Sequence, residues 1–168
     1  LRLQEDRVGL LHRIKVCGKC KDIDMVTQIH AEVLKKNLIP KDTYIATALL
    51  SCYAKCGALN KARQVFEQLP ARNAVPWNAL ISGYAQHGLG VPALELYKNM
   101  QEENVIPDKV LFASVLQACT SIRELDQGRL IHDEAIRDGC ESHIVVGNTL
   151  VDLYAKCGSI EEARRIFD

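Results

Sequence analysis

The feature that most constrains how this chain can fold is an internal repeat. Tyr53-Ala-Lys-Cys-Gly57 returns unchanged as Tyr154-Ala-Lys-Cys-Gly158, and the related Tyr84-Ala-Gln-His-Gly88 lies between them. The tyrosines of the first two copies are 31 residues apart. A period of about 20 to 50 residues indicates structural units that stack on their neighbours to bury a shared core.

A second set of repeats fills the gaps between these copies. Val16-Cys17 followed by Ile29-His30 is similar to Ala118-Cys119 followed by Ile131-His132. Together the two sets divide the chain into units of 31 to 36 residues. We expect the end of a preceding segment at 1–6 and units at 7–42, 43–73, 74–108, 109–143 and, incomplete, 144–168.

Each unit carries two amphipathic helical patterns. In the unit 74–108, apolar residues recur every three or four positions from Trp77 to Tyr84 and again from Ala93 to Met100, which is the spacing of a buried helix face. Glycines follow the first pattern where a left-handed C-terminal cap is expected; these are Gly57, Gly88 and Gly158. The sequence therefore predicts an all-α solenoid of helix–turn–helix repeats.

Composition excludes several classes of protein. The chain is 48% hydrophobic and 25% charged, as in globular rather than disordered proteins. Its 21 Lys and Arg balance 21 Asp and Glu, so no basic charge covers the whole molecule, although charge can gather on one face. No apolar run reaches the roughly 20 residues of a membrane span. The 7 cysteines are an odd number in a chain long enough to fold without disulfides, and we expect reduced thiols.

One unit identifies a family. It reads Val75-Pro-Trp77-Asn78-Ala-Leu-Ile-Ser-Gly-Tyr84-Ala-Gln-His-Gly88 and ends in Val105-Ile-Pro107-Asp108. This closely resembles the plant pentatricopeptide repeat, whereas the tetratricopeptide pattern Trp-x-x-Leu-Gly-x-x-Tyr is absent. The alternating unit lengths resemble the mixed subclass of long, short and standard repeats. By that resemblance 7–42 and 109–143 are long units, 43–73 and 144–168 short ones and 74–108 a standard one, in a right-handed α-solenoid.

The resemblance implies binding of single-stranded RNA at one nucleotide per repeat. In the family, the fifth residue of a unit's first helix and the last residue of the unit contact the base edge. Carried over, Thr47 with Asn73 favours adenine, Asn78 with Asp108 favours uracil, and Asn148 favours a pyrimidine. Asn73 could equally serve as an Asx-turn residue.

The second residue of each unit is expected to sandwich the bases. These residues are Tyr44, Val75, Val110 and Val145. The long units depart from the pattern, because Leu11 and Ala113 place an apolar side chain at the fifth position. Those units either space the reading units or contact RNA without selecting a base. Lysines of the long units, such as Lys15, Lys19 and Lys21, could contact phosphates or form a solvated face.

The cysteines and histidines raise the question of a zinc site. Cys17-Gly-Lys-Cys20 followed by His30 contains the residue types of a zinc deaminase, but in the reverse order. His30 also recurs as His132 without such cysteines, so packing explains both histidines better. We expect no metal, no cofactor and no enzymatic activity. The repeated tyrosines are likewise expected in the core, and Trp77 between helices.

The resemblance also implies a role for the parent protein. It is expected to be a land-plant factor for C-to-U RNA editing in the chloroplast or mitochondrion, with splicing or transcript stability as the next possibility. Other RNA-processing factors are expected partners, and the exposed ends of the solenoid could self-associate; no membrane is involved. The alternative from another class is a protein–protein scaffold that uses the same concave surface.

Overall fold

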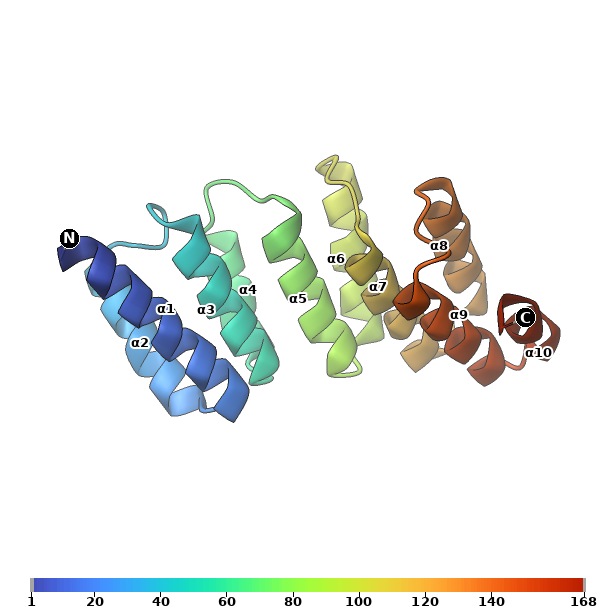
Figure 1. Cartoon of the computed structure of the whole chain (residues 1–168), viewed down its shortest axis with the longest axis horizontal. Helices are drawn as coiled ribbons and strands as arrows, with labels where there is room; N and C mark the ends of the chain where they lie inside the picture. Colours follow the sequence, from blue (N-terminus) through green and yellow to red (C-terminus); the bar gives the residue numbers. More distant parts are fainter. Residues whose placement is uncertain (1, 168) are drawn as a thin grey trace. The chain divides into compact units, whose positions relative to one another are not determined.

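The computed structural model describes residues 2–167, with side chains from residue 7 onward. This part of the chain contains ten α-helices and no strand (Figure 1). The helices are α1 (Arg2–Cys20), α2 (Ile23–Lys35), α3 (Thr43–Lys55), α4 (Leu59–Glu67), α5 (Ala74–Gln86), α6 (Gly90–Glu102), α7 (Lys109–Ile122), α8 (Leu125–Arg137), α9 (Ile144–Lys156) and α10 (Ile160–Phe167). Their contacts divide the chain into two compact units, Leu1–Gly83 and Tyr84–Asp168.

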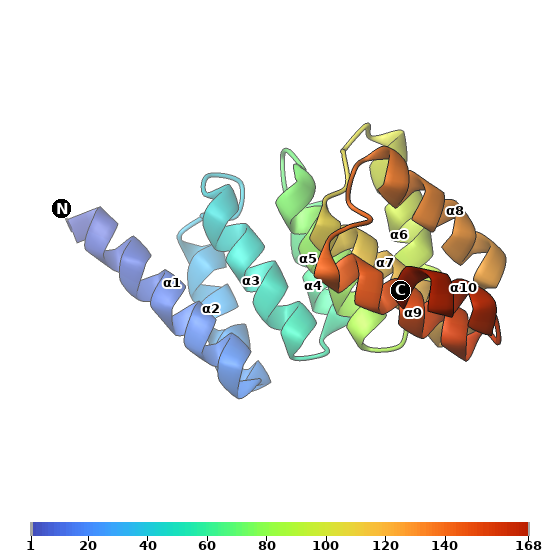
Figure 2. The same ribbon diagram turned by 45° about the vertical axis from the view of Figure 1, so that its right-hand side comes forward.

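In the first unit, α3 is the central helix. It contacts α1, α2 and α4, and Figures 1 and 2 show α1 and α3 running side by side. Its apolar face is fully buried at Leu49, Leu50 and Tyr53. Trp77 at the start of α5 is 2% exposed and meets Phe66 of α4 edge to face, with ring centroids 4.6 Å apart. The predicted position of Trp77 between helices is therefore confirmed.

In the second unit, α7 and α9 are the central helices. Helix α7 contacts α6, α8 and α9, while α9 also contacts α8 and α10. Leu111, Phe112 and Leu116 of α7 and Leu150 of α9 are fully buried. Within residues 2–167, no helix has the length and apolar content needed to cross a bilayer.

The helix ends follow the sequence with one exception. Gly57, Gly88 and Gly158 have φ values of 77°, 73° and 82°, which confirms the predicted left-handed caps. The first helix, however, begins at Arg2 rather than near residue 7. No glycine or proline separates residues 2–6 from the rest of α1, so nothing in the backbone chemistry stops the helix there.

Candidate nucleic-acid interface

A groove of about 770 Å³ lies on the first unit, lined by α1, α3 and the start of α5. Four of the predicted base-reading and base-sandwiching residues line it: Tyr44, Thr47, Asn73 and Val75. They come from segments about 30 residues apart in the chain. The structure thus brings both predicted base-reading residues of the unit 43–73 to one surface, together with two predicted base-sandwiching residues.

The groove has a basic wall. Lys15 and Lys19 are one turn apart on α1, and Lys55 ends α3. All three line the groove, and no Asp or Glu is found among its described lining residues. Lys21 lies outside the groove. The structure therefore divides the lysines singled out in the sequence into groove-lining and peripheral ones, and the groove lining carries positive side chains although the whole chain is neutral.

Thr47 reaches the groove from the second turn of α3 and is half-buried. Its hydroxyl donates a hydrogen bond to the carbonyl oxygen of Thr43, with 2.7 Å between the oxygens. Because a carbonyl oxygen only accepts, the hydroxyl proton is held in this bond. Thr47 therefore presents lone pairs, and not a proton, to a ligand in the groove.

Asn73 lies just before α5 and is exposed. Its Oδ1 accepts a hydrogen bond from the backbone N–H of Val75 at 3.1 Å. This is the Asx-turn role that the sequence left open, and it coexists with a place on the groove wall. One lone pair of Oδ1 is engaged in this bond, and the amide NH₂ is the donor group that Asn73 offers to a ligand.

The last residue of every predicted complete unit caps the helix that follows it. Asp42 accepts from the backbone N–H groups of Tyr44 and Ile45. Asp108 accepts from Leu111 N at 2.8 Å, and His143 Nδ1 from Val145 N at 3.3 Å. The sequence interpretation missed this role at Asp42, Asp108 and His143, although an Asp or Asn directly before an apolar helical pattern is a known signal for an N-cap.

The predicted sandwiching residues are all open to solvent. Their exposed fractions are 61% for Tyr44, 60% for Val75, 55% for Val110 and 49% for Val145. Each lies two residues after a capping residue, on the first turn of its helix. Apolar side chains in this repeated exposed position are available for contact with a planar ligand.

The remaining predicted base-reading residues do not line the groove. Asn78 is half-buried on α5 of the first unit and is not among the residues that line the groove. Asp108 and Asn148 are exposed on the second unit, at the start of α7 and on α9. The predicted pair Asn78 and Asp108 is therefore divided between the two units. Ala113, the apolar fifth residue of a predicted long unit, is 9% exposed and packs in the core.

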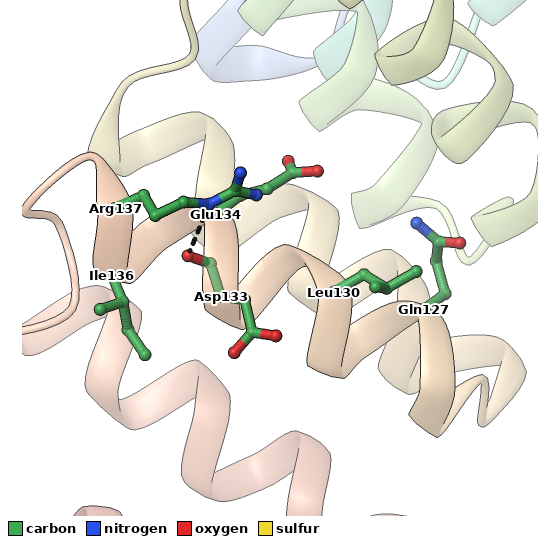
Figure 3. A pocket seen from close by; sticks show the side chains of 6 residues that line it. All are labelled: Gln127, Leu130, Asp133, Glu134, Ile136 and Arg137. Atoms are coloured by element: carbon green, nitrogen blue, oxygen red, sulfur yellow. Dashed lines mark hydrogen bonds between the residues drawn. The ribbon is translucent and has the colours of Figure 1, made fainter.

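A second hollow, of about 520 Å³, lies on α8 alone (Figure 3). Leu130 and Ile136 border it together with Asp133, Glu134 and Arg137. Arg137 donates to the backbone oxygen of Asp133 at 3.3 Å, within its own helix. Side chains of one helix diverge rather than converge, as Figure 3 shows for Ile136 and Leu130, so this hollow lacks the converging polar groups of a ligand site.

The repeated histidines and tyrosines have structural roles. His30 Nδ1 is 3.0 Å from the Tyr53 hydroxyl, and His132 Nδ1 is 2.8 Å from that of Tyr154. Tyr53, Tyr84 and Tyr154 are at most 6% exposed, which confirms core packing. In the part of the chain that the structure describes, no three His, Cys, Asp or Glu side chains gather in a metal-binding arrangement.

Comparison with known proteins identifies the family. The sequence pattern of the PPR repeat family matches residues 72–121, and that of the PPR repeat matches residues 44–73 and 148–168. The chain belongs to the pentatricopeptide repeat family. It is 37% identical over 154 residues to a mitochondrial pentatricopeptide repeat-containing protein of Arabidopsis thaliana, and 41% identical over 155 residues to a chloroplastic one. Each match covers 92% of this chain but only 15% and 19% of those relatives.

Solved pentatricopeptide repeat structures share the fold. The protein PPR10 in complex with an 18-nt psaJ RNA element matches 86% of this chain with a TM-score of 0.74 and 19% identity. PPR10 from maize matches 94% with a TM-score of 0.73 and 22% identity. These matches cover 22% and 23% of the PPR10 chains. The predicted all-α solenoid of helix–turn–helix repeats is confirmed.

Proposed function

We propose that this pentatricopeptide repeat chain binds single-stranded RNA and reads adenine in the groove of its first compact unit, Leu1–Gly83. The observation that carries the proposal is the convergence of Thr47, Asn73, Tyr44 and Val75 on one groove with a lysine-rich wall. PPR10, which shares the fold, is a protein whose structure contains RNA. The chain's own part is binding; any reaction on the RNA belongs to another domain or partner.

The hydrogen-bonding groups of the groove support adenine. Thr47 presents an acceptor, because its hydroxyl proton is engaged within α3, and Asn73 offers the donor of its amide NH₂. Adenine carries an amino-group donor beside ring-nitrogen acceptors, whereas guanine and uracil carry a carbonyl acceptor where that amino group would be. An adenine amino group can donate to Thr47 while Asn73 donates to a ring nitrogen. Cytosine carries the same order of amino donor and ring-nitrogen acceptor on a smaller ring. The affinity for adenine is therefore best compared with that for cytosine.

The distribution of charge supports contact with phosphates. Residues 1–83 contain 13 Lys and Arg against 7 Asp and Glu, a formal charge of +6. Residues 84–168 contain 8 against 14, a charge of −6. The zero net charge is therefore the sum of a basic and an acidic unit. Lys15, Lys19 and Lys55 place part of the basic charge on the groove itself.

The other readers are proposed from the family resemblance. Asn78 with Asp108 reads uracil, and Asn148 reads a pyrimidine; Asn contributes a donor and an acceptor, and Asp an acceptor. Val110 and Val145 contact the bases on the second unit. RNA runs parallel to the chain, so adenine precedes uracil.

A substitution at Thr47 tests adenine reading. Thr47→Val keeps the shape but removes the lone pairs, so affinity for a short A-U-containing RNA falls about three- to tenfold, roughly the range of one hydrogen bond. Thr47→Ser retains the hydroxyl and most of the affinity. Fluorescence anisotropy with labelled RNAs measures both affinity and base preference. The RNAs carry adenine, cytosine, guanine, uracil or unsubstituted purine, which lacks the amino group of adenine, at the site.

Thr149→Val is the matched control. Thr149 also donates to its own helix, to Val145 O at 2.8 Å, but lies outside the groove. Equal losses for the two valine variants would contradict adenine reading at Thr47. Absence of any RNA binding by the unmodified chain at low salt would favour the protein–protein scaffold instead.

We also propose that the parent protein belongs to the mixed subclass and directs C-to-U editing in a chloroplast or mitochondrion. Support comes from the alternating unit lengths and from relatives named as mitochondrial or chloroplastic. RNA-processing factors would then be further partners, and the ends of the repeat array could self-associate. Sequencing target transcripts in plants that lack the protein tests this: loss of one C-to-U event supports editing, and altered splicing or transcript level supports the other roles.

A further inference from the structure

Tyr44 differs from the other residues at its repeat position. It is aromatic, whereas Val75, Val110 and Val145 are aliphatic. It lines the groove and is 61% exposed. A planar ring on the groove wall can stack on a base, and base–aromatic stacking is among the stronger contacts of single-stranded nucleic acid. An exposed side chain can adopt several rotamers, so a contact that fixes the ring in one of them favours stacking.

Arg7 of α1 lies against this ring. Its guanidinium carbon is 5.7 Å from the centroid of the Tyr44 ring, within the range of a cation–π interaction. Arg7 is absent from the described residues that line the groove. The guanidinium of Arg7 is therefore not part of the groove wall, and its contact with Tyr44 leaves the groove lining open to a ligand.

Asp42 fixes the guanidinium in place. Arg7 Nη2 donates to Asp42 Oδ1 at 3.2 Å, and Arg7 Nε donates to Oδ2. Oδ1 also accepts from the backbone N–H groups of Tyr44 and Ile45 at 3.1 and 3.2 Å. The hydrogen bonds from Arg7 hold the pKa of the Asp42 carboxyl below its ordinary value. Both carboxylate oxygens are thus engaged, and Asp42 joins α1 to the first turn of α3.

We propose that Arg7 is a positioning residue for RNA: anchored on Asp42, it holds the Tyr44 ring as the platform on which a base stacks in the groove. This inference rests on the proposed RNA binding. Asp42, the last residue of the predicted unit 7–42, then serves as an anchor and not as a base reader. Arg7 contributes to affinity only through Tyr44 and only when a base is present.

The first test compares two arginines of α1. Arg7→Gln removes the contacts to Asp42 and Tyr44, so affinity for an adenine-containing RNA falls about two- to fivefold, the range of an exposed cation–π contact. Arg13→Gln is the control: it removes the same charge and a comparable ion pair, to Glu32 at 2.8 Å, outside the groove. Equal affinity losses for the two variants would overturn the proposal.

The second test separates positioning from direct contact with RNA. An RNA that is abasic at the site retains its phosphates but has no base to stack. The loss caused by Arg7→Gln is expected to disappear with this RNA, and also in the background of Tyr44→Leu. A loss that persists in either case would mean that Arg7 contacts the RNA itself, and the proposal would be wrong.

Asp42→Asn provides an independent variant. It keeps an oxygen that caps α3 but removes the charge that anchors Arg7. The same two- to fivefold loss is expected, with a thermal unfolding midpoint close to that of Arg7→Gln. If the unmodified chain binds RNA and Asp42→Asn binds it equally well, this inference fails while the proposed function stands. If the unmodified chain binds no RNA, both fail.

Discussion

Among single residues, two of the predicted base-reading residues, Asn73 and Asp108, also cap a helix. Asn73 caps α5 with Oδ1 and also lines the groove. Under the proposed function, this side chain serves stability through its acceptor and recognition through its donor. Because the two roles use different atoms, a substitution can remove one and keep the other.

Asn73→Asp is the substitution that separates them. Aspartate keeps an acceptor oxygen at the start of α5, where the helix dipole also favours a negative charge. The thermal unfolding midpoint should therefore stay within about a degree or rise, while affinity for adenine-containing RNA falls because the donor is lost. Asn73→Ala should lose affinity and also about 1 kcal/mol of unfolding free energy. A large drop in stability for Asn73→Asp would show that more than capping holds this position.

At the scale of helices, close approach limits the choice of residue. A Cβ on Gly90, the first residue of α6, would lie 2.6 Å from the carbonyl oxygen of Ala118 on α7. A backbone atom inside a packed helix cannot move aside as a flexible side chain can. Gly147 on α9 has no atom within 4 Å of such a Cβ. Close packing therefore requires glycine at position 90, whereas position 147 has room for a side chain.

Alanine at these two positions tests the packing. Gly90→Ala should lower the unfolding free energy by about 1–3 kcal/mol, since α6 and α7 must separate. Gly147→Ala should leave it unchanged or raise it by up to about 1 kcal/mol, because alanine is the better helix former. Chemical denaturation followed by circular dichroism measures both. A neutral Gly90→Ala would mean that α6 packs less closely on α7 than described.

For the whole molecule, the net charge of zero is the sum of a basic first compact unit and an acidic second one. The first unit carries +6 and the second −6. RNA binding that depends on the groove should therefore depend on the first unit's lysines and on salt. Counterion release makes the logarithm of the binding constant fall with the logarithm of salt concentration, by about 0.7 for each phosphate contacted in a single strand.

Replacing Lys15, Lys19 and Lys55 together with glutamine tests this dependence. The salt slope should decrease by about 2, corresponding to three phosphate contacts. Lys21, Lys35 and Lys41 form the matched control set, because they belong to the same unit but do not line the groove. Anisotropy titrations at several salt concentrations measure the slopes. Equal slopes for the two triple variants would contradict a phosphate-binding role for the groove wall.

The amino-acid sequence alone was enough to predict the repeat, the helices and the glycine caps at their C-terminal ends. These features are local or repeated, so they can be recognised from the sequence. They are the helical periodicity, the glycines at 57, 88 and 158 and the buried tyrosines. The same holds for the exposed second residue of each unit. The resemblance also selected Thr47 and Asn73, which the structure places on one groove, while their reading of adenine stays a prediction.

Which residues of different helices meet at the groove depends on how the helices pack. The contact of Arg7 with Tyr44 and the position of Lys15 and Lys19 on the groove wall depend on the packing of α1 against α3. The hydrogen bond from Thr47 to Thr43 is local to α3 and depends on the rotamer of Thr47. Periodicity specifies which face of a helix is buried, but not which residue of another helix lies opposite. The start of α1 at Arg2 was missed because residues 2–6 carry no repeat signal that marks a helix boundary.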